Sequence, residues 1–135
     1  MVEKGIVALL LADSNVAALV GTRVYPAITR QTQERPNVVY QRLTTNRIST
    51  QDGPTGSADC LLQLSCWADT YKAARTLAEK VRLALDGYAG TSASVVIDGI
   101  FVQDEQDMPT PPDSGDEVGV YGVRLDFRVH FQESF

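Results

Sequence analysis

The chain has 135 residues, 44% of them hydrophobic, which fits one globular domain that buries roughly two thirds of its unfolded surface. Its 17 acidic and 12 basic residues give a formal net charge of −5. No run of Lys or Arg could neutralise a row of phosphates, so tight nucleic-acid binding by the isolated chain is disfavoured. The apolar stretch over 6–12 is far shorter than the ~20 residues that span a bilayer and follows no positively charged segment. We therefore expect synthesis in the cytoplasm and no membrane partner.

The first elements are helical. Residues 2–12 place apolar side chains at helical spacing, and a short second turn over 15–20 follows a cap at Asp13 or Ser14. Gly21 is typical of the left-handed position that ends a helix, and the chain then continues extended into a sheet.

A long hairpin is predicted next. Residues 37–43 are rich in β-formers, residues 51–57 collect turn formers, and residues 58–68 alternate between apolar and polar side chains. Cys60 and Cys66 lie on the apolar side of this last strand. At ~3.3 Å per residue their Cα atoms stand roughly 20 Å apart, too far for a disulfide, so we expect two small buried thiols.

The second half again has the order of one helix followed by two strands. Residues 70–86 carry an apolar stripe at helical spacing, with Asp69 as the predicted N-cap and Gly87 as the stop. Residues 95–102 read as a third strand, and residues 123–131 alternate strictly between an apolar and a polar face.

These elements predict an α+β fold with the order α-β-β-α-β-β. It would be a two-layer α/β sandwich: a four-stranded, mainly antiparallel sheet with two helices on one face and a polar opposite face. We expect one domain over residues 1–135, with flexible loops near 45–57 and 103–117.

The chain shows few signs of catalysis. It contains no nucleophile elbow, phosphate-binding glycine loop, dinucleotide fingerprint or zinc-protease motif. His130 is the only histidine, and its polar strand position suits a solvated or interface residue better than a general base. We therefore predict that the protein is not an enzyme and assign no catalytic, cofactor-binding or metal-binding residue.

The segment 103–117 holds six of the 17 acidic residues and three prolines. Its spacing does not match a calcium-binding EF-hand loop, so it is interpreted as a solvated hairpin loop or as a loop that orders against a partner protein. Together with two arginines of the last strand it gives the predicted partner interface: Asp104, Glu105, Asp107, Asp113, Asp116, Glu117, Arg124 and Arg128.

Several stretches, in chain order, resemble the tail-terminator or tail-completion family of long-tailed bacteriophages. They are ADSNVAALVGTRVYP, PNVVYQRL, LLQLSCWADTYKAARTLAEKVRLALDGYAG, QDEQDM and VRLDFRVHFQE. The most specific parts are the CWADTYKAA junction and the closing LDFRVHF strand, and the resemblance covers nearly the whole chain.

The resemblance implies a structural virion protein, made in the bacterial cytoplasm and placed at the head-proximal end of the tail. Such proteins typically form a hexameric ring that caps the tail tube, stops its polymerisation and presents a surface for the head connector. The implied partners are further copies of the chain, the major tail tube protein and the connector, while DNA passes without specific binding. Two alternatives stay open: another phage neck or head-completion protein, and a monomeric α+β domain with a closed apolar pocket for a small molecule.

Overall fold

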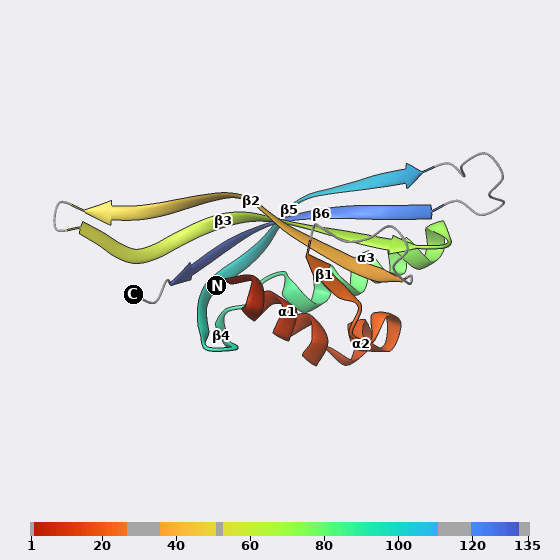
Figure 1. Cartoon of the computed structure of the whole chain (residues 1–135), viewed down its shortest axis with the longest axis horizontal. Helices are drawn as coiled ribbons and strands as arrows, with labels where there is room; N and C mark the ends of the chain where they lie inside the picture. The colour runs from red at the N-terminus through yellow and green to blue at the C-terminus, as the bar shows by residue number, and fades with distance from the viewer. Residues whose placement is uncertain (1, 27–35, 51–52, 111–119, 133–135) are drawn as a thin grey trace.

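The computed structural model describes residues 2–26, 36–50, 53–110 and 120–132. Within these ranges, three helices lie on one face of a strongly twisted six-stranded sheet (Figure 1). The elements in chain order are α1 (Val2–Ala12), α2 (Ser14–Val20), β1 (Val24–Pro26), β2 (Asn37–Thr50), β3 (Gly53–Ala68), α3 (Tyr71–Leu85), β4 (Gly90–Ser92), β5 (Val95–Thr110) and β6 (Val120–Gln132).

The strand order is β1-β2-β3-β6-β5-β4, which corrects the predicted four-stranded sheet with two helices. The order α-β-β-α-β-β is wrong because it omits the two edge strands and counts α1 and α2 as one helix. β1 pairs with β2 in parallel, so the sheet is mixed. Each edge strand has only three residues, and β4 consists of Gly, Thr and Ser, so neither carries a readable alternation.

The long strands extend beyond the predicted ones. β2 and β3 pair from Asn37↔Trp67 to Thr50↔Gly53, and β5 and β6 pair as far as Thr110↔Val120. The expected loops at 45–57 and 103–117 are therefore wrong for residues 45–50, 53–57 and 103–110, where cross-strand pairing overrides the local turn formers. The rest of those two loops lies outside the described residues.

The two hairpins project in opposite directions from the helical layer (Figure 1). β3 is central and pairs with β6 from Ser57↔Gln132 to Ala68↔Tyr121. The first residues of β3, 53–56, lie before the pairing with β6 begins, and their described pairing is with β2 alone.

The helix termini follow the sequence closely. The Asp13 carboxylate accepts hydrogen bonds from the backbone N–H groups of Asn15 and Val16 at 3.0 Å, and Gly21 adopts φ +60° after the last turn of α2. The N-cap of α3 is Thr70, whose hydroxyl accepts from the Ala73 N–H at 3.1 Å, and not Asp69 as predicted.

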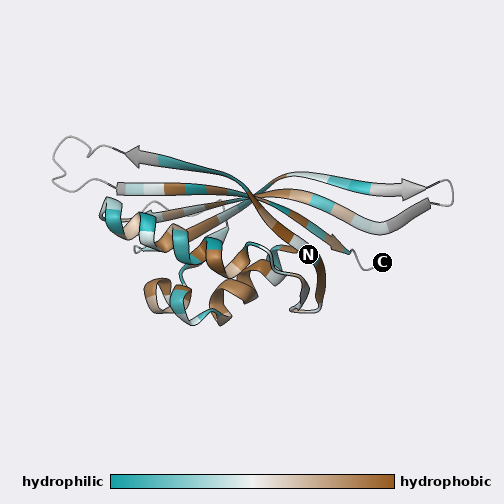
Figure 2. Cartoon of the chain, turned by 180° about the vertical axis from the view of Figure 1, so that it is seen from behind, coloured by the Kyte–Doolittle hydropathy of each residue, from teal (hydrophilic) through white to brown (hydrophobic). Residues whose placement is uncertain are grey.

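The core lies between the helices and the sheet. Alternate residues of β3 and β6 are fully or almost fully buried there, including Leu62, Leu64, Leu125 and Phe127, and α3 contributes the predicted stripe. Figure 2 shows α1 and α2 apolar along most of their length, whereas α3 has hydrophilic residues along its outer side. Among the described residues, no helix is long and apolar enough to cross a membrane.

Candidate functional site

The sheet face opposite the helices has a polar, charged surface, which we call the uncovered face. Its side chains alternate with the buried side chains along β3, β6 and β5. We define it by these residues: Asp59, Gln63, Ser65 and Trp67 of β3, Phe101, Asp104 and Gln106 of β5, and Arg124, Asp126, Arg128 and His130 of β6.

One ion pair of this face joins Arg128 to Asp59. The Arg128 Nη1 donates to the Asp59 Oδ1 at 3.0 Å, and the Asn46 amide lies 3.4 Å from the same oxygen. In the ladder Asp59 faces His130, so Arg128 reaches diagonally to the carboxylate of the neighbouring strand. The pair therefore links β3 and β6 on the uncovered face.

A second group surrounds Arg124. Its Nε lies 3.7 Å from the Asp126 Oδ1, its Nη2 lies 3.9 Å from the Asp104 Oδ2, and the guanidinium also donates to the Gln106 side chain. Asp104 and Asp126 are opposite each other in the ladder, just after a bulge in β5. Because two directly opposed carboxylates repel, Arg124 is the group that makes this juxtaposition tolerable.

Aromatic rings cover two glycines of the same face. A Cβ at Gly122 would lie 2.6 Å from the Trp67 ring, and one at Gly99 would lie 2.8 Å from the Phe101 ring. Phe101 also meets His130 edge-to-face, with ring centroids 6.0 Å apart. His130 therefore lies on the polar face of β6, as predicted, and contacts an aromatic ring there.

Glu105 and Asp107 are on the other face of β5, beside α3. Arg75 lies 3.1 Å from an Asp107 oxygen and 3.3 Å from a Glu105 oxygen, and the Tyr71 hydroxyl donates to Asp107 at 2.9 Å. The hydrogen bond to the Asp107 carboxylate raises the pKa of Tyr71. These two carboxylates hold the β5–β6 hairpin to the start of α3.

The predicted interface residues are therefore divided. Asp104, Arg124 and Arg128 share the uncovered face, Glu105 and Asp107 lie on the helix side, and Asp113, Asp116 and Glu117 lie outside the described residues. The sequence alone did not predict the side chains that pair with these residues: Asp59, Gln106, Asp126, Arg75 and Tyr71. Alternation alone could have placed Asp59 on the polar face, but the register that brings it to Arg128 is not visible in the sequence.

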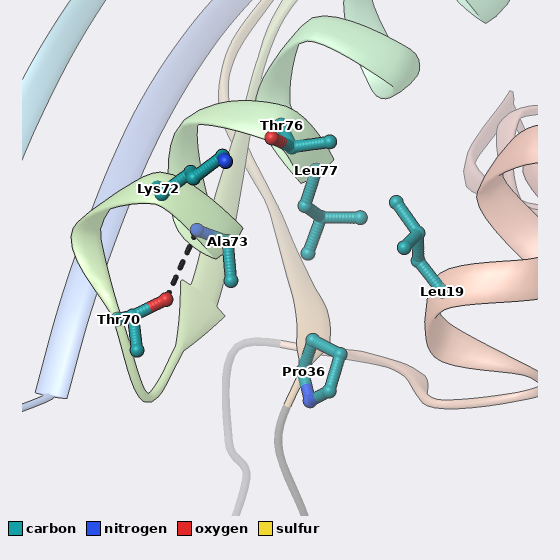
Figure 3. Close-up of a pocket in the computed structure, with 7 residues that line it drawn as sticks. All are labelled: Leu19, Pro36, Thr70, Lys72, Ala73, Thr76 and Leu77. Atoms are coloured by element: carbon teal, nitrogen blue, oxygen red, sulfur yellow. Dashed lines mark hydrogen bonds between the residues drawn. The ribbon is translucent and has the colours of Figure 1, made fainter.

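A surface cleft of about 270 Å³ lies between α2, the first turns of α3 and the start of β2 (Figure 3). Leu19, Pro36 and Leu77 give it an apolar lining, and Lys72 is its charged residue. Thr70, Lys72 and Ala73 are exposed, so this cleft is open to solvent and differs from the closed apolar pocket that a small-molecule-binding domain requires.

The two thiols of the chain lie on the covered side of β3. Burial raises the pKa of Cys60 from 9.0 to about 11 and that of Cys66 from 9.0 to about 12, so both thiols are protonated at neutral pH. Both lie in β3, as predicted, and are buried and unbridged. Among the described residues, no group of three or more His, Cys, Asp or Glu side chains could hold a metal ion.

Comparison with known proteins identifies what this arrangement is similar to. The family model described as tail completion protein gp17 matches residues 4–132. A solved structure described as the virion of a native gene transfer agent (GTA) particle contains a chain of the same fold. Its TM-score is 0.73 at 22% sequence identity, covering 95% of this chain and 92% of that chain. No curated protein matches the chain.

Proposed function

Because the chain belongs to the tail completion protein family, we propose that it caps the finished end of a phage tail tube as a ring of six copies. It is a component of the virion tail. In the proposed role, the ring ends tail polymerisation and then joins the tail to the head connector. The observation that carries this proposal is the family match, which spans all the described elements rather than one motif.

A rigid scaffold supports a capping role. The central strands β3 and β6 pair over twelve residues each, from Ser57↔Gln132 to Ala68↔Tyr121, and α3 packs its stripe against them. Such a core holds two projecting hairpins at fixed positions on opposite sides (Figure 1). A subunit of this shape can contact one neighbour on each side, which is what a closed ring of identical copies requires.

The uncovered face supports a role in contact rather than in chemistry. Its side chains form ion pairs and aromatic contacts among themselves, and the thiols of the chain are buried on the opposite face. We propose Asp104, Arg124 and Arg128 as partner-facing residues of this surface. Glu105 and Asp107 complete the described part of the proposed interface, and Asp113, Asp116 and Glu117 of the same chain segment are proposed with them.

The charge of the ring suits a DNA path. Each copy carries −5, so six copies carry about −30, and a lumen of that sign repels the phosphate backbone. DNA would then pass during packaging or ejection without being retained. Weak DNA affinity is in this view a functional property, and the specific partners are the major tail tube protein and the head connector.

The test is a phage that lacks this protein. We expect filled heads without tails, and unattached tails that are frequently longer than normal, because nothing ends polymerisation. Tails of normal length joined to heads would contradict the proposal. Complementation provides matched controls: Lys72→Glu should restore particles, whereas Leu77→Asp, which breaks the core, should not.

Purified protein separates the proposal from its nearest alternative. A tail-capping ring should bind isolated tails and appear in electron micrographs as a ring with a central hole. A head-completion protein would instead bind DNA-filled heads. Binding to heads and not to tails would therefore contradict the capping role and support a head-completion protein.

A further inference from the structure

The outer half of β5, residues 103–110, begins with five polar residues. Residues 103–107 read Gln-Asp-Glu-Gln-Asp and are all exposed, whereas Ile97 and Ile100 of the inner half are buried in the core. Burial of one face gives a strand a single register, but a strand that is polar on both faces can pair in more than one register. The core therefore fixes the pairing of β5 with β6 only as far as Val102, which packs against it.

A bulge lies where the apolar part of β5 ends. The register shifts by one residue between Val102 and Asp104, so Gln103 has no partner in the described ladder. Beyond the bulge Asp104 is directly opposite Asp126, and like charges in that position destabilise a sheet. In the described part of the chain the Asp126 Oδ1 and the Arg124 Nε, 3.7 Å apart, are buried without a hydrogen-bond partner. The contacts of the uncovered face alone are therefore a weak reason for this register.

Two side chains of α3 hold the observed register from the helix side, and we call Tyr71 and Arg75 the α3 clamp. Arg75 lies 3.1 Å from an Asp107 oxygen and 3.3 Å from a Glu105 oxygen, and the Tyr71 hydroxyl donates to Asp107 at 2.9 Å. The side chains of these ion pairs are 34–43% exposed, and ion pairs of that exposure each contribute little to stability. The clamp therefore holds the register by a small margin in free energy.

A second register results if Gln103 joins the ladder opposite Asp126. Every later residue of β5 then moves to the other face, because side chains alternate along a strand. Glu105 would lie opposite Arg124 on the uncovered face, and Asp107 would follow on the same face two residues later. An opposite-charge pair then replaces two opposed carboxylates, which favours this register on the uncovered face. On the helix side, the α3 clamp would keep one carboxylate instead of two.

We infer that the outer half of β5 is a two-register switch. In the free protein the α3 clamp holds Glu105 and Asp107 on the helix side, and contact of a positively charged partner with the uncovered face moves both to that face. Asp104 leaves the face in exchange, so the face gains one negative charge, and the partner's preference for that charge selects the second register. The inference rests on the proposed function for the partner, and it adds how an interface divided between two faces becomes one.

Two variants act on the switch in opposite directions. Tyr71→Phe/Arg75→Gln removes the clamp contacts and releases the outer half of β5. Deletion of Gln103 removes the extra residue, so that the observed pairs form without a bulge and the second register is lost. Arg82→Gln is the control for the first variant, because it removes the same charge two turns further along α3. Thermal unfolding first establishes that each variant folds.

The register is read by cysteine pairs at the end of the described ladder. Thr110 is opposite Val120 in the observed register, and Pro109 would be opposite Val120 in the second. Opposite Cα atoms in an antiparallel pair are about 4.5–5.5 Å apart, within reach of a disulfide, whereas a side chain one residue out of register points to the other face. Thr110→Cys/Val120→Cys therefore reports the first register and Pro109→Cys/Val120→Cys the second, each as a loss of two mass units on mild oxidation. The native thiols are buried and do not compete.

Without a partner, the pair for the second register should bridge about tenfold or more slowly than the pair for the first. The release variant should raise the bridging rate of the second pair about tenfold, and Arg82→Gln should leave that rate unchanged. Isolated tails should raise the same rate in the chain that keeps its clamp. Deletion of Gln103 should abolish this rise and weaken tail binding about tenfold, because the two carboxylates stay on the helix side.

The other outcomes overturn the inference. If the release variant leaves the second pair as slow as before, β5 has one register and the switch does not exist. If tails bind without raising the bridging rate of the second pair, or bind the deletion variant equally well, partner contact does not use the switch, although the capping role stands. If tails are not bound at all, capping fails and the partner-driven step fails with it, while the release variant still decides whether two registers exist. If the deletion variant does not fold, the bridging rates with and without tails decide alone.

Discussion

The two faces of the sheet are built from the same strands and differ in almost every other respect. On the covered face, Cys66, Leu125, Phe127 and Val129 have no exposed surface at all. On the uncovered face, the neighbouring residues of β3 and β6 are partly exposed and held by ion pairs such as Arg128–Asp59. Burial of apolar area stabilises a fold by kilocalories per side chain, whereas an exposed ion pair contributes about 0–1 kcal/mol. The covered face therefore determines whether the chain folds, and the uncovered face can change without unfolding it.

The largest expected effect comes from placing a charge in the covered layer. Leu77→Asp or Val81→Asp buries an unpaired carboxylate between α3 and the sheet, at a cost of about 3 kcal/mol or more, and should leave the protein unfolded. Lys72→Glu and Arg82→Glu, on the outer side of the same helix, should keep the wild-type fold. Circular dichroism with urea unfolding checks all four, and equal stability of the four would contradict the division between the faces.

The sequence predicted the covered layer well because burial leaves a period. Local patterns predict the stripe of α3, the alternation of β6, a cap at Asp13 or Ser14 and a helix end at Gly21, and the structure confirms them with Asp13 as the cap. The even spacing of Cys60 and Cys66 likewise predicts that both lie on one face of β3. Local chemistry was sufficient wherever the environment of a residue repeats along the chain.

The edges and the contacts of the uncovered face were not predictable in the same way. β1 and β4 are strands only because β2 and β5 pair with them over three residues each. The turn formers of residues 53–57 predict a loop, yet pairing with β2 and β6 makes them part of β3. The candidate interface is divided between two faces because successive residues of a strand alternate, so Asp104 lies on one face and Glu105 and Asp107 lie on the other. The bulge between Val102 and Asp104 determines which of these residues join the uncovered face, and it leaves no local signature in this sequence.

A smaller effect is expected at the buried thiols. Cys66→Ala removes one sulfur from the covered face and should cost roughly 1–2 kcal/mol, without loss of assembly. The Cys60→Ala/Cys66→Ala variant should behave in the same direction. The intact mass of wild type should be the same with and without reductant. A mass two units lower before reduction would reveal a disulfide.

The same thiol gives the covered face a pH dependence. Burial raises the pKa of Cys66 from 9.0 to about 12, so the folded state keeps the proton that the unfolded state releases above pH 9. Stability from this group is complete below pH 9 and falls between 9 and 12, by roughly 1 kcal/mol at pH 10. Urea unfolding at pH 8 and pH 10 should show a smaller loss in Cys66→Ala than in wild type. Equal losses would place the alkaline sensitivity elsewhere.

The smallest effect is expected from the ion pair of the uncovered face. Asp59→Asn, Arg128→Gln and the double variant form a cycle around one contact of 3.0 Å, and we expect a coupling free energy of about 0.5 kcal/mol that decreases in high salt. Both side chains keep some solvent contact, so neither single variant leaves a fully buried charge without a partner. A coupling above about 2 kcal/mol would mean that this pair is desolvated like a core group, and the uncovered face would then share in holding the fold. A small coupling, combined with loss of particle assembly in the same variants, would separate the two roles: the pair would shape a surface that partners contact, while the opposite side of the same two strands keeps the chain folded.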